Sequence, residues 1–204
     1  MRNIAVIGSS GAIGYALTQH FSNLYPNATV HSFSSSLHKI SCPKIFTNTI
    51  KYDDEGSIEL AAALATRERL LDLVIVTSGF LHDENIRPEK ALRDLSADKF
   101  LKLFTANAIT PALIAKYFVP RLSIETSSIF AALSARVGSI SDNKLGGWYS
   151  YRASKAALNM IIKNLAIETA RHKDNAIIVG LHPGTVDSAL SRPFQANVPG
   201  GKLF

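Results

Sequence analysis

The sequence predicts an α/β fold in which helices flank a doubly wound parallel sheet. Short apolar segments alternate with segments of helical period along the chain, and the connections between them are short. A glycine-rich segment, residues 8–14, separates the first apolar segment from the first helical one. With 204 residues, of which 47% are hydrophobic and 19% charged, the chain suits one globular domain.

The first half of the chain predicts four strands and two helices. Residues 3–7 form a nearly continuous apolar run, which is typical of a strand buried on both faces of a parallel sheet. Beyond the glycine-rich segment, apolar side chains recur at helical spacing before Pro26, at Ile13, Leu17, Phe21 and Leu24. The other elements predicted here are strands at residues 29–33, 44–49 and 73–77 and a helix at residues 57–69.

The second half predicts two long helices and two strands. Ser96 can cap a helix that reaches Ile114, with a local kink at Pro111 because proline lacks a backbone donor. Residues 128–133 and 176–181 are predicted strands, joined by a polar loop and a helix over residues 148–171. That helix is apolar nearly all round, so we expect it to be buried on more than one side. Alternating strands and helices imply right-handed crossovers, with ligands at the carboxyl ends of the strands.

The glycine-rich segment predicts a Rossmann-type phosphate cradle. Gly8, Gly11 and Gly14 lie between a predicted strand and a predicted helix, where they permit a tight turn and let backbone amides approach a pyrophosphate. An ordinary glycine-rich turn is the alternative interpretation. The residues predicted to contact a dinucleotide here are these glycines together with Ser9, Ser10 and Ile13.

The segment after the second predicted strand favours NADP(H), with NAD(H) as the alternative. An acidic residue about 20 positions after the glycines would hold the ribose hydroxyls of NAD, yet residues 29–40 contain no Asp or Glu. Ser34, Ser35 or Lys39 could hold the extra phosphate of NADP. A solvated serine-rich loop is an equally compatible interpretation of this cluster.

Tyr151 and Lys155 are the candidates for proton transfer. They are four residues apart in a predicted helix, so their side chains lie on one face. A nearby ammonium would stabilise the phenolate and lower the tyrosine pKa toward working pH, as a general acid–base requires. The spacing alone is weak evidence, because it is common on solvated faces of amphipathic helices.

Three longer segments strengthen this interpretation. Residues 133–139 (LSARVGS), 146–155 (GGWYSYRASK) and 181–187 (LHPGTVD) resemble the short-chain dehydrogenase/reductase family, and in particular its C-factor-like branch. The resemblance extends over nearly the whole chain. It implies a single cofactor-binding domain over residues 1–204, which ends before the last helix and strand that relatives usually carry.

The resemblance also implies roles for individual residues. Ser134, 17 residues before Tyr151, would hydrogen-bond the substrate carbonyl, with Ser139 and Ser141 as alternatives. Asn107 would help to hold a water linked to Lys155; its alternative is a solvent-facing helix residue. Tyr151 and Lys155 would contact the cofactor, and the further cofactor contacts implied are Thr77, Ser78, Gly79, Pro183, Gly184 and Val186. Two positions depart from the family pattern, because Ala12 replaces a glycine and Lys51 replaces an acidic adenine contact.

These features predict an oxidoreductase that moves hydride between a nicotinamide cofactor and a small carbonyl or alcohol. The alternative is a signalling or interaction protein that binds cofactor without relevant turnover. We expect no metal, because Cys42 is the only cysteine, and no nucleic-acid partner, because the net charge of +6 is dispersed.

We also expect a cytoplasmic protein without a membrane span, because no apolar run is long enough to cross a bilayer. A homodimer or homotetramer is predicted through the helix at residues 148–171 and the one near Phe104. Burial of these apolar helices within the monomer core is the alternative.

Overall fold

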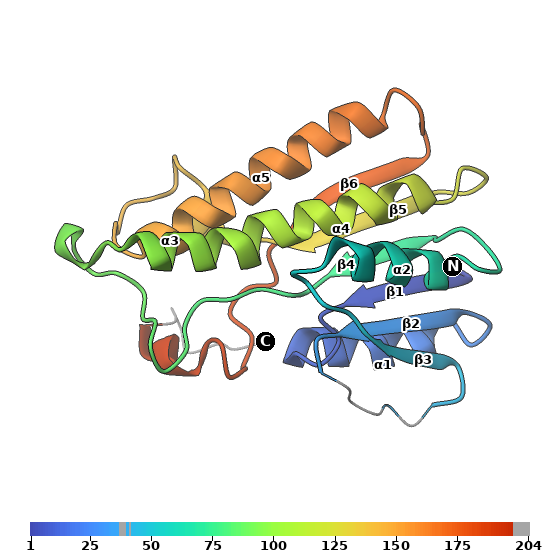
Figure 1. Cartoon of the computed structure of the whole chain (residues 1–204), viewed down its shortest axis with the longest axis horizontal. Coiled ribbons are helices and arrows are strands. Elements are labelled where there is room, and N and C mark those ends of the chain that lie inside the picture. The colour runs from blue at the N-terminus through green and yellow to red at the C-terminus, as the bar shows by residue number, and fades with distance from the viewer. Residues whose placement is uncertain (37–39, 41, 198–204) are drawn as a thin grey trace.

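The chain folds into six parallel strands in the order β3-β2-β1-β4-β5-β6 (Figure 1). The structure is a computed structural model, and it describes residues 1–36, 40 and 42–197. The strands are β1 (Asn3–Ile7), β2 (Thr29–Ser34), β3 (Ile45–Thr49), β4 (Leu73–Val76), β5 (Ser128–Leu133) and β6 (Ala176–Leu181). This order reverses direction beside β1, as in a doubly wound sheet, and confirms the predicted fold class.

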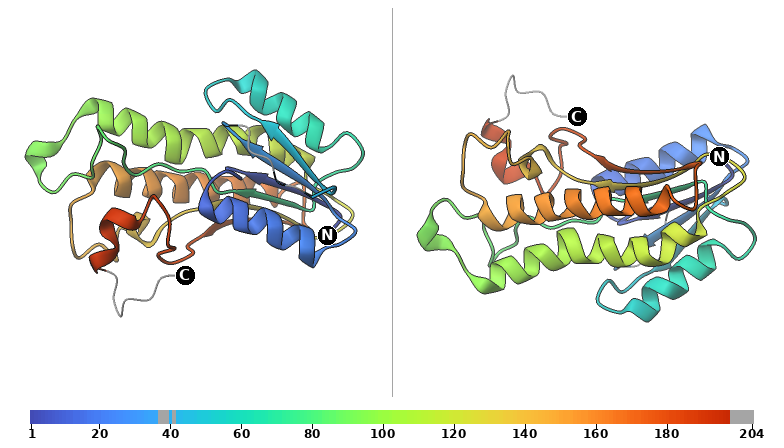
Figure 2. Two further views of the ribbon diagram at one scale, coloured as in Figure 1. Left: turned by 90° about the horizontal axis from the view of Figure 1, so that it is seen from below. Right: turned by 90° about the horizontal axis from the view of Figure 1, so that it is seen from above.

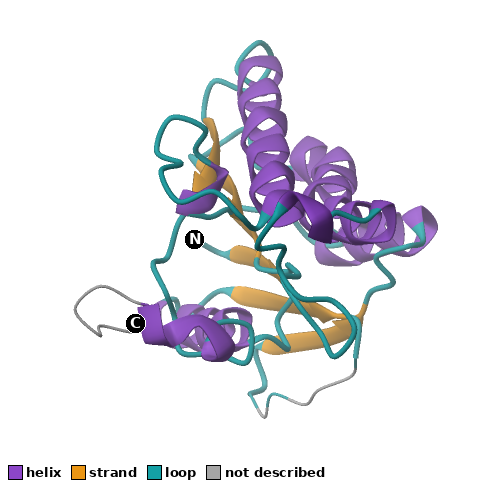
Figure 3. Cartoon of the chain, turned by 90° about the vertical axis from the view of Figure 1, so that its left-hand side faces the viewer, coloured by secondary structure: helices purple, strands orange, loops and turns teal. Residues whose placement is uncertain are grey.

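Helices cover both faces of the sheet. They are α1 (Ala12–Leu24), α2 (Glu55–Ala65), α3 (Ala97–Phe104), α4 (Thr110–Phe118) and α5 (Tyr149–Thr169). Three of them, α2, α4 and α5, lie over one face, while α1 lies over the other (Figure 2). The carboxyl ends of the strands and the loops that follow them face the viewer in Figure 3.

The core consists of one apolar layer on each side of the sheet. Phe33, Phe118 and Phe130 are buried between the sheet and the helices α2, α4 and α5. Ile4, Val6 and Val30 are buried on the face that carries α1. All five residues of β1 are buried, so its unbroken apolar run reflects a strand covered on both faces.

Several bounds and one helix cap differ from the sequence predictions. The second helix begins at Glu55 and not at residue 57, because Asp54 caps it by accepting a hydrogen bond from the Ser57 amide at 3.3 Å. Ser96 occupies the N-cap position of α3, but its side chain makes no capping hydrogen bond. The helix α5 covers Tyr149–Thr169 and not residues 148–171, and Met160 and Ile167 on it are 61% and 46% exposed.

The irregularity predicted at Pro111 lies just before it. Residues Thr105–Ile109 form a π-helical turn between α3 and α4, and the Thr110 amide donates to Thr105 O across that turn. Pro111 offers no amide to the turn that precedes it, so the regular helical ladder cannot continue there. The wide turn contains Asn107, which is fully buried.

No helix in the described part of the chain is long and apolar enough to cross a membrane.

His31 makes the stability of the fold sensitive to acid. Its ring lies between Phe33 and Phe46 at 6.3 and 5.8 Å, and burial lowers its pKa to about 4 against the opposing effect of Glu68. The folded state resists protonating His31, whereas the unfolded chain takes up the proton near pH 6.5. The stability that neutral His31 contributes to the folded state is therefore fully present above pH 6.5 and is lost as the pH falls toward 4.

The unfolding free energy of the wild type should fall between pH 7 and pH 4.5, in part because His31 takes up a proton on unfolding. We predict that in His31→Phe this fall is smaller by about 2 kcal/mol. Denaturant unfolding at both pH values measures this loss. His20→Phe, an equal change at an exposed position of α1, should leave the pH dependence unchanged. An unchanged pH dependence in His31→Phe would contradict the assignment.

Candidate active site

The glycine-rich loop is fastened to the ends of β1, β2 and β4. The amides of Gly8 and Ser9 both donate to Phe33 O, at 2.8 and 3.1 Å. Thr77 Oγ1 donates to Ile7 O at 2.9 Å and contacts Gly8 O at 3.1 Å. The loop therefore sits at the carboxyl edge of the sheet, directly before the N-terminus of α1.

Two glycines in this loop cannot be replaced without steric conflict. Gly8 has a φ of +89°, in the region that favours glycine. A Cβ atom on Gly14 would lie 2.3 Å from Gly8 O and 2.6 Å from Thr77 Oγ1. Gly11 is less constrained, because a Cβ atom there would meet only Gly8 O at 3.4 Å.

The serines of the two predicted phosphate-binding segments differ in their surroundings. Ser9 is buried, and its hydroxyl donates to Phe33 O at 3.0 Å, whereas Ser10 is exposed. Ser34 is buried and donates to Ser36 O at 2.5 Å, whereas Ser35 is exposed. Lys39 lies outside the described residues. Only Ser10 and Ser35 of these serines present a side chain to solvent.

A cavity of about 690 Å³ is lined in part by Ser78, whose backbone packs against Gly8 so closely that a Cβ atom on Gly8 would lie 2.6 Å from the Ser78 nitrogen. Ser35, Ser78 and Gly79, all predicted cofactor contacts, lie in its wall beside residues of α3, the π-helical turn and the segment after β3. Ser78 Oγ is buried without a hydrogen-bond partner among the described residues. A pocket of this size with an unpaired polar atom in its wall suits a small ligand that carries hydrogen-bonding groups.

Lys155 is buried where α5 meets the end of β5. Its Nζ donates to Leu133 O at 2.8 Å and lies 5.9 Å from the centroid of the Tyr151 ring. A Cβ atom on Gly79 would lie 3.7 Å from this Nζ, which places Lys155 beside the wall of the cavity. Burial lowers the pKa of Lys155 to about 8.

Asn107 joins the segment after β4 to α5. Its Oδ1 accepts from the Phe80 amide at 2.8 Å, and its Nδ2 donates to Phe80 O at 2.8 Å and to Ser154 Oγ at 3.2 Å. Ser154 precedes Lys155 and is itself fully buried. Asn107 is thus an internal brace, and the solvent-facing alternative is wrong.

The environment of Tyr151 reverses the expected pKa shift. The side chain is 9% exposed and packs with Leu81 and Leu103, and its ring centroid lies 6.1 Å from that of Trp148. Burial raises its pKa to about 12, although the sequence predicted a decrease from the nearby ammonium. Desolvation therefore dominates in the chain by itself, and the phenol is protonated at neutral pH.

Ser134 directly follows Leu133, but its hydroxyl points to a residue that the sequence analysis did not single out. Ser134 Oγ donates to Asn159 Oδ1 at 2.6 Å. The alternatives Ser139 and Ser141 lie in the following loop and contact each other at 3.5 Å. Asn159 could have been noticed as a polar residue on the helix stripe that carries Tyr151 and Lys155.

Glu89 is a second residue that the sequence analysis missed. It is 1% exposed, and its carboxylate accepts hydrogen bonds from Ser150 Oγ at 2.6 Å and from the Ser150 amide at 3.3 Å. A carboxylate is favourable at a helix N-terminus, and here it anchors the start of α5 just before Tyr151. The one feature of this contact that the sequence shows is the pair Gly146-Gly147: both have positive φ, and a Cβ atom on Gly147 would lie 3.2 Å from Glu89 O.

The loop after β6 folds back over the Tyr151 side of the site. Pro183, Gly184 and Val186 are half-buried, and Gly184 has a φ of +77°. The 3₁₀ turn Arg192–Asn197 then brings the Phe194 ring to 4.9 Å from Trp148 and 5.3 Å from His82. An aromatic cluster therefore adjoins Tyr151, and the spacing of these distant residues gave no sign of it.

Comparison with known proteins identifies the family. A family model described as short chain dehydrogenase matches residues 2–199. The chain belongs to the short-chain dehydrogenase/reductase family. Membership in this oxidoreductase family confirms the resemblance inferred from the sequence.

Two relatives show how this dehydrogenase/reductase compares in sequence. C-signal of Myxococcus xanthus is 34% identical over 109 residues, which are 53% of this chain and 64% of that protein. The chain therefore spans less than two thirds of C-signal. The 1-hydroxy-2-glutathionyl-2-methyl-3-butene dehydrogenase of Rhodococcus sp. (strain AD45) is 25% identical, with 95% of this chain and 82% of that protein covered.

Solved structures share the fold of this dehydrogenase/reductase at low identity. The NADPH-bound carbonyl reductase from chicken fatty liver has a TM-score of 0.81 and 24% identity, with 93% of this chain and 78% of that chain covered. A putative short-chain dehydrogenase/reductase from Burkholderia multivorans with bound NADP has a TM-score of 0.79 and 22% identity, with 99% of this chain and 84% of that chain covered.

The glycine loop provides a direct test of the steric argument. We predict that Gly14→Ala lowers the unfolding free energy by about 2–3 kcal/mol, because its methyl group would overlap Gly8 O and Thr77 Oγ1. Gly11→Ala is the matched control and should change the free energy by less than about 0.5 kcal/mol. Denaturant unfolding measures both values, and equal stabilities for the two variants would contradict the packing of the loop.

Proposed function

We propose that this chain is an NAD(P)-dependent oxidoreductase, with NADP(H) favoured, that acts on a small carbonyl or alcohol. The observation that carries the proposal is the buried group formed by Tyr151, Lys155 and Asn107 at the carboxyl ends of the strands. Gly79 links this group to the cavity, because it lines the cavity and adjoins Lys155 Nζ. Family membership supports the reaction class.

The residues around the cavity fit a dinucleotide. Gly8, Gly11 and Gly14 would let backbone amides face the phosphates, and the buried Ser78 hydroxyl has no hydrogen-bond partner among the described residues. When bound, the nicotinamide group supplies or accepts the hydride. Support for NADP(H) comes from the absence of an acidic residue in residues 29–40, from exposed Ser35, and from two structural neighbours that were solved with bound NADPH or NADP.

The chain's own groups can handle the proton of the substrate oxygen. The Tyr151 phenol, whose pKa burial raises to about 12, is protonated at neutral pH, so it can donate to a carbonyl oxygen as hydride arrives. Lys155, with a pKa of about 8, is mainly charged at neutral pH and can hold a ribose hydroxyl while favouring the phenolate that remains. Ser134 would provide a second polar contact to the same oxygen.

A signalling or interaction protein that binds cofactor without turnover is the second candidate function. The similarity to C-signal of Myxococcus xanthus favours this second candidate, because the name of that relative refers to a signal. The enzyme proposal is preferred, since binding alone requires neither a buried acid–base tyrosine nor its lysine.

Tyr151→Phe distinguishes these two functions. We predict that it lowers kcat/KM for carbonyl reduction by roughly 10²–10⁴-fold while NADPH affinity stays within about threefold, because the ring is kept and only the transferable proton is lost. NADPH fluorescence gives the affinity and its consumption gives the rate. Full reductase activity in the variant would contradict the proton-transfer role, whereas an inactive wild type that binds NADPH would favour the binding protein.

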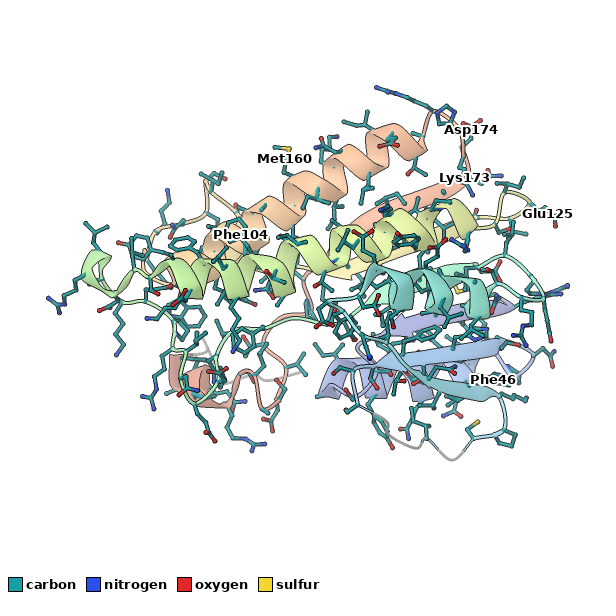
Figure 4. All side chains as sticks on the ribbon, viewed as in Figure 1. Phe46, Phe104, Glu125, Met160, Lys173 and Asp174 are labelled. Atoms are coloured by element: carbon teal, nitrogen blue, oxygen red, sulfur yellow. The ribbon has the colours of Figure 1, made fainter. Side chains whose placement is uncertain are left out.

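We further propose that residues 1–204 act as one cytoplasmic domain that binds neither nucleic acid nor membrane and forms a homodimer or homotetramer. Apolar side chains remain exposed along the helical face that was predicted to associate. Leu101 and Ile109 are 67% and 49% exposed, and Met160 points away from the sheet on α5 (Figure 4). Association would remove this apolar surface from water.

We predict that Met160→Glu converts the assembly to monomers, because it would bury an unpaired carboxylate in the interface. Sedimentation at micromolar concentration measures the change. Leu24→Glu is the matched control, since Leu24 is 53% exposed on α1, across the sheet from α5. A monomeric wild type would contradict the proposed assembly, and an assembly that persists in Met160→Glu would contradict its interface.

A further inference from the structure

Ser134 is hydrogen-bonded to a residue on the same helix stripe as Tyr151 and Lys155. Asn159 Oδ1 accepts the Ser134 hydroxyl at 2.6 Å. Asn159 follows Lys155 by four residues and Tyr151 by eight, so the three side chains project from one side of α5. Asn159 is exposed and Ser134 is half-buried, so a ligand can approach the pair.

The surrounding backbone is shaped around this pair. Ser134 is fixed by its amide, which donates to Leu181 O at 2.8 Å. Gly138 approaches α5 so closely that a Cβ atom there would lie 3.0 Å from Asn159 Nδ2. A Cβ atom on Gly180 would lie 3.8 Å from both Asn159 Oδ1 and Ser134 Cβ. Gly138 therefore leaves room for the pair, whereas a Cβ atom on Gly180 would make only an ordinary van der Waals contact with it.

The partner of the Ser134 proton decides what the serine can bind. A hydroxyl has one proton to donate and lone pairs to accept with. While Asn159 Oδ1 takes the proton, Ser134 Oγ can only accept a hydrogen bond from a ligand. An alcohol can donate such a bond, but a carbonyl oxygen cannot. The observed arrangement therefore suits an alcohol.

A half-turn of the Asn159 amide about its last torsion reverses this polarity. Nδ2 would then donate to Ser134 Oγ, and the serine proton would be released toward a carbonyl oxygen. In the observed orientation Nδ2 donates to Gly138 O at 3.4 Å. That bond is long for an N–H donor, so the half-turn gives up only a weak hydrogen bond, but it also turns Oδ1 toward Gly138 O, where two acceptors face each other.

We propose that Asn159 is a positioning residue that sets whether Ser134 donates or accepts a hydrogen bond. One orientation of its amide matches the site to a carbonyl substrate, and the other matches it to the alcohol. Asn159 acts through Ser134 and needs no contact with the reacting atoms. The inference rests on the proposed function, because it requires a substrate oxygen at Ser134.

Asn159→Asp tests this role, because a carboxylate can only accept hydrogen bonds. The Ser134 hydroxyl then always donates its proton to residue 159 and cannot donate it to a substrate. Asn164→Asp is the matched control, an identical change at another exposed position of α5. The carbonyl probe is whichever of benzaldehyde, acetophenone, cyclohexanone and butanal the wild type reduces best with NADPH. Alcohol binding is followed through Trp148, the only tryptophan, whose ring lies 6.1 Å from that of Tyr151.

We expect Asn159→Asp to lower kcat/KM for the carbonyl about tenfold, equivalent to about 1.4 kcal/mol. Affinity for the matching alcohol, affinity for NADPH and the melting temperature should be preserved. In a Ser134→Ala background the same change should have no further effect, since a residue that acts through Ser134 cannot act without it. Asn164→Asp should behave as the wild type.

Two outcomes overturn the inference alone. One is a wild-type kcat/KM in Asn159→Asp, and the other is an equal loss with and without Ser134. If the wild type binds no NADPH, or binds it and reduces none of the four carbonyls, the proposed function fails and this inference fails with it.

Discussion

The burial of Lys155 is the constraint on which the site depends. An amine removed from water is stable only where the protein supplies hydrogen-bond partners. Leu133 O, the last carbonyl of β5, supplies one at 2.8 Å. This bond holds α5 against the end of β5, and thereby fixes Tyr151 one helical turn earlier and Asn159 one turn later.

Two further elements are arranged around the same helix. The π-helical turn turns Asn107 inward, so that its amide connects Phe80 with Ser154 and braces the segment after β4. Glu89 anchors the N-terminus of α5 through Ser150. A change at Lys155 would therefore disturb groups that come from several separate parts of the chain, which is how a doubly wound sheet assembles a site at one edge.

The strands could be predicted from the sequence because they are short apolar runs between polar breaks. β1, β5 and β6 have the predicted bounds, since each run ends abruptly at a polar, charged or glycine residue or at a loop. Helix ends were less accurate, because they depend on which side chain actually caps. Asp54 caps α2 two residues before the predicted start, and Ser96 makes no capping bond.

In the candidate site, too, some features could be predicted from the sequence and others could not. The glycine loop and the Tyr151–Lys155 pair have local spacings that sequence can show, and the family resemblance added Asn107 and Ser134. The Ser134–Asn159 bond, the buried Glu89 and the approach of Phe194 to Trp148 join residues 25 or more positions apart, so they follow only from packing. The pKa of Tyr151 was predicted in the wrong direction because sequence spacing shows a nearby charge but not the loss of solvent.

The most direct test of the account is a calorimetric titration of NADPH into the wild type and a Lys155→Met variant. If Lys155 joins the cofactor cavity to the proton-transfer group, the wild type binds one NADPH per chain and the variant binds at least about tenfold more weakly, a difference of about 1.4 kcal/mol. Equal affinities in two folded proteins, or no binding by the wild type, would contradict the central claim.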